Sequence, residues 1–226
     1  MEHLEKYGLW KNAEEAAEIF RQIVNFLPDA TFVTDDSGRV IAWNRAIEKM
    51  TGVEAKDMLG KGNYEYSLAF YEERRPVLID LVTQPEQEIL AKYSHVRREG
   101  DILISETEPE MLKLGDVHLL NLASPLYDRE GRVIGAIEAI RDITEQKKAA
   151  KALKESEERF RLTFYASPDA VNLNRMEEGL WVDINEGFTR LTGFTREDVL
   201  GKTSLEMNIW NDPEDRKRLV RELKEK

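Results

Sequence analysis

Aromatic rings and guanidinium groups gather in residues 64–75, the stretch of this chain best suited to bind a small molecule. A pocket for a small carboxylate or an aromatic ligand typically has aromatic walls and one or two arginines, because arginine binds carboxylates bidentately and keeps its charge. The candidate ligand-binding residues are Tyr64, Tyr66, Phe70, Arg74, Arg75 and, on a later predicted strand, Asn121. The alternative interpretation stays open: such rings also fill hydrophobic cores, and arginines beside Glu72 and Glu73 also form solvated ion pairs.

Residue patterns typical of catalysis are absent from the sequence. Without cysteine, the chain can form no disulfide, thiolate metal site or cysteine nucleophile. Its three histidines, His3, His95 and His118, lack the spacing that binds a metal from one helix face. The phosphate-binding glycine loop, nucleophile elbow, zinc helix motif and kinase motifs are missing as well. The sequence therefore predicts a regulatory protein rather than an enzyme, with no metal site.

Charge and hydropathy narrow the class of partner. The 226 residues include 44 acidic and 33 basic side chains, a net charge of -11. This balance argues against binding to nucleic acid or an anionic membrane, since both need clustered Lys and Arg. The sequence has no apolar run of 18 residues and no signal-peptide pattern. We therefore expect a cytoplasmic protein, or the cytoplasmic piece of a larger one, without membrane contact.

The elements that must position the candidate site are two strands, several helices and then three strands. Residues 31–44 read as a hairpin with a tight turn at 36–38, and Asn44 can cap the helix predicted at 45–50. The pattern is helical from 64 to 98, with a restart at Pro85 towards residue 93. Three strands follow at 102–106, 117–126 and 133–143. This order predicts an α+β fold with an antiparallel sheet.

Two amphipathic helices flank this first domain. Residues 12–27 place apolar side chains on one helical face that has to be buried, on the same chain or against a second copy. Residues 145–164 carry a narrow seam with alternating spacings of three and four, typical of a short coiled coil. The seam positions are Ile143, Gln146, Ala150, Leu153, Glu157, Phe160 and Phe164. The alternative is a solvated connector helix.

An internal repeat relates the two ends of the chain. Pro28-Asp29-Ala30 recurs as Pro168-Asp169-Ala170, Asn44 as Asn185, Thr51-Gly52 as Thr192-Gly193, and Gly60-Lys61 as Gly201-Lys202. With these motifs, both copies resemble PAS sensor domains, and Asp142-Ile143-Thr144 resembles the exit of such a domain into a signalling helix. The resemblance implies a PAS fold: a five-stranded antiparallel sheet in the order 2-1-5-4-3, with helices on one face, an N-terminal cap helix and a C-terminal signalling helix.

The resemblance also implies a domain plan and a role. The plan is a helix at 1–27, a complete PAS domain at 28–144, a linker helix at 145–164, and the N-terminal half of a second PAS domain at 165–226. Such tandem domains occur in proteins such as sensor histidine kinases, where they bind small molecules or join two chains. Asn44, Asp142 and Thr144 would then relay the signal. A scaffold that only dimerises through the N-terminal and linker helices is the alternative function.

The resemblance bears on cofactors too. PAS-like haem sensors carry a histidine beside the pocket, and His95 is the residue nearest to such a place. Flavin chemistry through a cysteinyl adduct is excluded, because the chain has no cysteine. Haem on His95 and non-covalent flavin remain alternatives, but a lone histidine is usually a surface residue. We expect no cofactor.

Overall fold

The computed structural model describes the whole chain except residues 1–12, 86, 88, 90–94, 177 and 226. The predicted start of the N-terminal helix, His3 and the end of the helix predicted towards residue 93 therefore lie outside the described residues. The chain divides into two units, residues 1–148 and 149–226, and each is treated by itself.

The first unit is built on an antiparallel sheet in the order β2-β1-β6-β5-β4-β3. Five of its strands follow the predicted order. Their bounds are β1 Ala30–Asp35, β2 Val40–Trp43, β4 Ile102–Thr107, β5 Leu119–Tyr127 and β6 Val133–Asp142. The sixth, β3 Val96–Glu99, corrects the prediction of five strands and of helix up to residue 98. Val96 turns inward and Gly100 takes φ +60°, which closes a hairpin onto β4.

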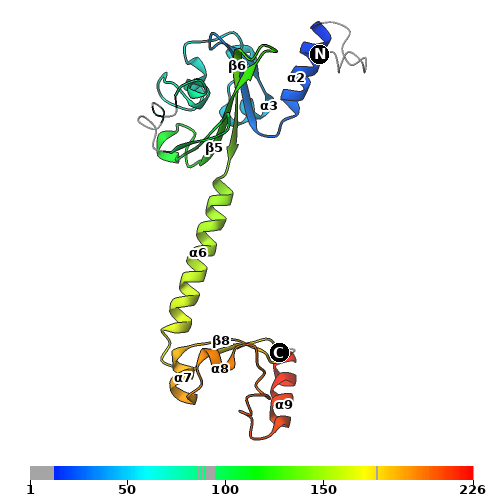
Figure 1. The fold of residues 1–226 in the computed structure, drawn as a ribbon, viewed down its shortest axis with the longest axis vertical. Coiled ribbons are helices and arrows are strands. Elements are labelled where there is room, and N and C mark those ends of the chain that lie inside the picture. Colours follow the sequence, from blue (N-terminus) through cyan, green and yellow to red (C-terminus); the bar gives the residue numbers. More distant parts are fainter. Residues whose placement is uncertain (1–12, 86, 88, 90–94, 177, 226) are drawn as a thin grey trace. The chain divides into compact units, whose positions relative to one another are not determined.

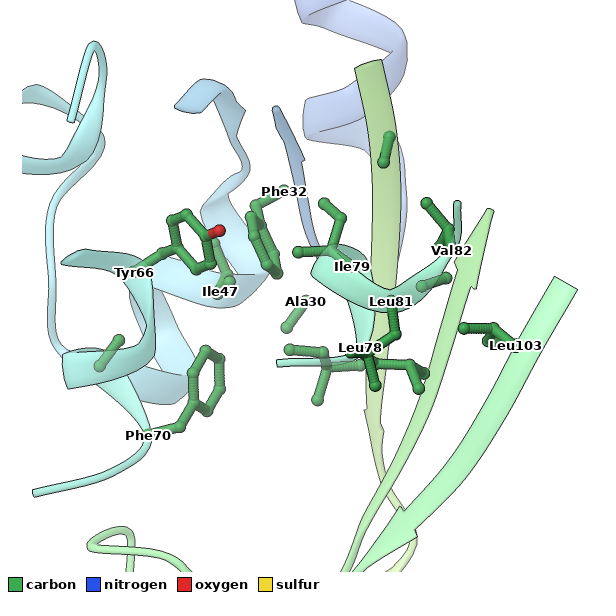
Figure 2. Close-up of a cluster of buried hydrophobic side chains, with 14 of the residues drawn as sticks. Ala30, Phe32, Ile47, Tyr66, Phe70, Leu78, Ile79, Leu81, Val82 and Leu103 are labelled. Carbon is green, nitrogen blue, oxygen red and sulfur yellow. The ribbon is translucent and has the colours of Figure 1, made fainter. Parts of the chain in front are cut away.

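One face of the sheet carries the main hydrophobic core. Alternation along β6 turns Ala136, Glu138 and Ile140 to this face. Short helical segments cover it, and Figure 2 shows Tyr66 and Phe70 opposite Leu78 and Ile79 in the cluster. The segments are α3 Arg45–Thr51, α4 Ala55–Met58, and the 3-10 turns η1 Glu65–Ala69, η2 Leu78–Leu81 and η3 Pro109–Met111. The predicted helix after Pro76 is thus a single 3-10 turn.

Helix α2, Ala13–Phe26, covers part of the other face of the sheet. Its buried contact is Val24, which packs with Val33 and Ala42. The rest of its apolar face stays open, since Phe26 is 87% exposed. In Figure 1, α2 lies on the side of the sheet away from the turns of residues 60–85.

Helix α6, Thr144–Tyr165, runs out of the first unit and into the second. Asp142 caps it: its Oδ1 accepts a hydrogen bond from the Thr144 N–H at 2.8 Å. Ile143 is buried in the first unit and Phe164 in the second, whereas Leu153 between them is 61% exposed. The helix therefore has an uncovered apolar stretch in its middle.

The second unit repeats the start of the first. Its elements are β7 Asn172–Asn174, β8 Trp181–Ile184, α7 Glu186–Thr192, α8 Arg196–Val199 and α9 Pro213–Lys224. Asn185 accepts from the backbone N–H groups of Val171 and Phe188 at 2.9 Å, as Asn44 does from Thr31 and Ile47. Trp181, Ile184, Phe188 and Val199 form its small core. In its described part the sheet has two strands.

Candidate functional site

A cavity of about 190 Å³ lies in the first unit between strands β4, β5 and β6 and the segment that runs from Tyr71 through η2. Apolar side chains supply much of its wall. The polar residues that line it are Tyr71, Arg75, His95, Ser105, Glu106, Thr107, Asn121 and Glu138. Apolar walls with a few polar groups are typical of a site for a small molecule.

Glu138 is the most unusual residue of this cavity. It stands on β6 in an otherwise apolar run and is only 3% exposed. One carboxyl oxygen, Oε2, accepts a hydrogen bond from the backbone N–H of Ile79 at 2.9 Å. Burial raises the pKa of Glu138 to about 8, because an ionised carboxylate is poorly solvated there, and the nearby Asp80 charge acts in the same direction. Glu138 therefore holds its proton to a higher pH than an exposed carboxyl group does.

Asp80 and Tyr66 form a second acidic element beside Glu138. Asp80 accepts from the Tyr66 hydroxyl through Oδ1 and from the Val77 N–H through Oδ2, the latter at 2.8 Å. Burial raises the pKa of Asp80, and these two hydrogen bonds oppose the rise. Burial also raises the pKa of Tyr66, so its phenol stays neutral. The pair fixes η2 to η1 next to the cavity.

Asn121 faces the cavity from β5 and is 7% exposed. Its side-chain N–H₂ donates to Thr107 Oγ1 at 2.9 Å and to the Ser105 carbonyl at 3.3 Å. These bonds to β4 orient the amide. The amide oxygen receives no hydrogen bond from the residues that the structure describes.

Two of the predicted ligand residues, Arg75 and Asn121, line this cavity. The Arg75 guanidinium lies over the Tyr71 ring, 4.9 Å from its centroid, in a cation–π contact. Tyr71 and Arg75 thus form one polar part of the wall.

The other four predicted residues lie elsewhere. Tyr66 and Phe70 belong to the core and line a neighbouring void of only about 10 Å³. Arg74 pairs with Glu65, and Tyr64 is 38% exposed; neither lines the cavity. Tyr66 and Phe70 thus match the core interpretation, and Arg74 forms an ion pair with Glu65 rather than with Glu72 or Glu73, whereas Tyr64 matches neither interpretation.

Sequence reasoning missed Glu138 and Asp80. A signal for Glu138 was available: it is the single charge in residues 133–140, on a predicted strand flanked by apolar residues. A carboxyl group on the inward side of such a strand is expensive to bury without a role. Asp80 gave no comparable signal, because charged residues are common on a helix surface.

His95 also lines the cavity, although its side chain is exposed. In the described part of the chain, no three His, Cys, Asp or Glu side chains are arranged to hold a metal ion. The cavity, at about 190 Å³, lies below the roughly 300–1,000 Å³ of pockets for drug-sized ligands.

Strands that line the cavity also contact the first turn of α6. The His118 N–H, at the start of β5, donates to Thr144 Oγ1, and its carbonyl accepts from the Ile143 N–H, both at 2.9 Å. Glu106, on β4 in the cavity wall, forms an ion pair with Lys147 of α6. This pairing lowers the pKa of Glu106 and raises that of Lys147. The cavity wall and α6 are therefore in direct contact.

Asn44 has a structural role apart from the cavity, because its side chain joins three backbone segments. It accepts from the N–H groups of Thr31 and Ile47 and donates to the carbonyls of Val24 and Asp29. The side chain thus ties the end of α2 to β1 and α3.

Comparisons with known proteins match this geometry. A family model described as PAS fold matches residues 24–148, more than half of the chain, and one described as PAS domain matches residues 168–226. Sporulation kinase A of Bacillus subtilis is 26% identical over 210 residues, 91% of this chain and 31% of that protein. A phytochrome of Picea abies is 26% identical over 204 residues, 84% of this chain and 16% of that protein.

Solved structures resemble the fold more loosely. The PAS domain of Bordetella pertussis BvgS has a TM-score of 0.39 at 21% identity and covers 63% of this chain and 98% of that one. A sensory box sensor histidine kinase of Vibrio cholerae has a TM-score of 0.35 at 14% identity, over 58% and 94%. The chain spans less than a third of the curated relatives it matches. No described helix is long and apolar enough to cross a membrane.

Proposed function

The chain belongs to the PAS domain family, and from this premise we propose that it is the sensory part of a longer signal-transduction protein. A small molecule binds in the cavity of the first unit, and the resulting change passes to helix α6. The observation that carries this proposal is a shared strand: β4 lines the cavity, and its Glu106 pairs with Lys147 of α6.

A ligand can shift α6 only if it binds one arrangement of the cavity wall better than another. Two contacts would convey the difference, the Glu106–Lys147 pair and the hydrogen bonds between His118 and residues 143–144. In this proposal Asp142 and Thr144 act by holding the start of α6, and Asn44 acts by holding the end of α2. None of these residues takes part in a chemical step.

Arg75 in the cavity wall supports an organic acid as one candidate ligand, and the aromatic Tyr71 beside it supports a flat one. A library of small organic acids and aromatic compounds tests the site through the melting temperature of the purified protein. Ligand at 100 times its dissociation constant stabilises the folded state by about 2.7 kcal/mol. A library without any stabilising compound would remove the ligand-sensing proposal and leave dimerisation.

Dimerisation is the second candidate function, and exposed apolar side chains support it. Phe20, Ile23 and Phe26 of α2 are open to solvent, and Phe20 borders a groove of about 460 Å³ against β2 and α4. Leu153 and Phe160 are exposed on the predicted seam of α6. A second copy of the chain would cover both surfaces. Light scattering after size exclusion gives the mass directly, and a monomer at all concentrations would refute the idea.

The activity of the longer protein is a further proposal. Sporulation kinase A is a kinase by name and is similar over 91% of this chain, so we propose a sensor histidine kinase as the parent. The residues present here would then regulate rather than catalyse. Incubation of the chain with ATP tests whether these residues only regulate, and ATP turnover by the purified chain alone would contradict that proposal.

A further inference from the structure

We propose that the cavity takes a small ligand with a protonated nitrogen, such as a primary amine or a protonated heterocycle, which donates to Glu138 and to the Asn121 amide oxygen. The inference rests on the proposed function, because it names the ligand class of the same cavity. It departs from the organic acid that the two arginines predicted.

Both acceptors are buried and incompletely bonded. Glu138 uses Oε2 for the Ile79 N–H, and within the described residues nothing donates to its Oε1. Asn121 uses its N–H₂ group for Thr107 and Ser105, which leaves its oxygen as the free end. A ligand that brings N–H groups can donate to both of these oxygens from the cavity.

Charge points to the same class of ligand. The ionisable groups around Glu138 are Asp80 from η2, Tyr66 from η1, and Tyr71, Arg75, His95 and Glu106 around the cavity. Of the two bases, Arg75 stacks on Tyr71, and neither forms an ion pair with Glu138 in the described structure. Glu138 is thus a buried acid without a cation, next to a second acid. A cationic ligand supplies the missing partner.

The size of the cavity limits the ligand. A cavity of about 190 Å³ suits a ligand smaller than the drug-sized ones that occupy pockets of roughly 300–1,000 Å³. Val77, Leu78, Leu81 and Met111 line the remainder of the wall, so an apolar ring fits better than a polar chain. One ring with one short aminomethyl group has the required size and chemistry.

Three probes with one ring and different head groups test the proposal: benzylamine, benzyl alcohol and benzoate, titrated calorimetrically into the full chain. We expect benzylamine to bind most tightly. Its dissociation constant should fall about tenfold from pH 6 to pH 7, because Glu138, with a pKa of about 8, must ionise to bind the cation. At pH 7, binding should release about 0.9 proton, seen as a dependence of the enthalpy on the buffer.

Variants separate Glu138 from the other groups. Glu138→Gln keeps the shape, and it should abolish both the pH dependence and the proton release and weaken benzylamine about tenfold at pH 8. His95→Gln should keep the pH dependence, because the proposal assigns that dependence to Glu138. Glu99→Gln removes an acid from the same sheet outside the cavity, where Glu99 faces Arg97, and should change nothing.

The comparison of the three probes uses the unmodified chain, so it does not depend on whether any variant folds. Tighter binding of benzoate than of benzylamine, or benzylamine binding that is independent of pH, overturns the proposed ligand class and leaves the cavity as a ligand site. If none of the three probes binds, the proposed ligand class fails, whereas the sensing function is tested separately by the library of organic acids and aromatic compounds.

Discussion

Replacement of Asn44 by alanine should unfold the first unit far more easily, although the residue touches no ligand. The side chain is fully buried and makes four good hydrogen bonds, all to backbone groups. Alanine leaves the N–H groups of Thr31 and Ile47 without partners in the interior, whereas the Val24 and Asp29 carbonyls still accept from the Leu27 N–H and the Thr31 hydroxyl. Each such group costs about 1–3 kcal/mol, and the lower limit applies where a water enters the space left behind.

The expected loss is therefore about 4 kcal/mol in the free energy of unfolding, out of the roughly 5–15 kcal/mol of a typical domain. At about 4 °C per kcal/mol for a unit of this size, the melting temperature should fall by about 15 °C. Hydrogen exchange read by mass spectrometry on peptides from β1, β5 and β6 isolates the first unit from the second.

Two matched controls define the result. Asn25→Ala removes one exposed hydrogen bond to the Arg45 N–H and should cost no more than about 1 kcal/mol. Asn185→Ala removes the equivalent set of bonds in the second unit and should leave exchange in β1, β5 and β6 unchanged. A loss below about 1 kcal/mol for Asn44→Ala would refute the reasoning, since the two N–H groups would then have other partners.

Three further predictions concern the cavity acid, the relay and the linker helix. The pKa of Glu138 is raised to about 8 on folding, so the folded state holds this proton more tightly than the unfolded state does. The free energy of unfolding should therefore fall by up to about 1.4 kcal/mol per pH unit between pH 5 and 8. In urea titrations, the free energy of unfolding of Glu138→Gln should depend much less on pH, with Asp80 contributing the remaining slope. Lys147→Gln should speed hydrogen exchange in the first turn of α6 by at most about fivefold, because an exposed ion pair contributes about 0.2–1 kcal/mol. The control Lys151→Gln, on the same helix, should leave this exchange rate unchanged. An increase beyond tenfold for Lys147→Gln would mean that the pair contributes more than an exposed ion pair can. If a second copy covers the seam, Leu153→Glu should lower the mass measured by light scattering. The control Ala152→Glu, which is exposed but off the seam, should leave the mass unchanged. Equal masses for both variants would argue against a dimer through the seam.

The positions of five strands of the first unit could be predicted because alternation and turn residues mark them, and their order followed from the resemblance to PAS domains. β3 could not, since Val96-Arg97-Arg98-Glu99 has too few apolar residues to show an alternation, and its pairing depends on the Gly100 turn and on β4. The cavity was harder to predict than the sheet. Arg74 and Arg75 are neighbours in sequence, yet one pairs with Glu65 at the surface and the other lines the cavity. Which of the two arginines reaches the cavity depends on the path of the chain between η1 and η2.

The contact between the cavity and α6 limits how large a signal the module can give. A single charge-assisted hydrogen bond from a ligand to Glu138 contributes about 1.5–3 kcal/mol, whereas a switch from 1:99 to 99:1 needs about 5.5 kcal/mol. The exposed Glu106–Lys147 pair adds about 1 kcal/mol at most. A ligand of this kind can therefore produce a large change only if the two arrangements of α6 already lie close in energy. Polar residues at the seam positions Gln146 and Glu157 would keep them close, because they weaken the pairing of two such helices and thereby its preference for one register.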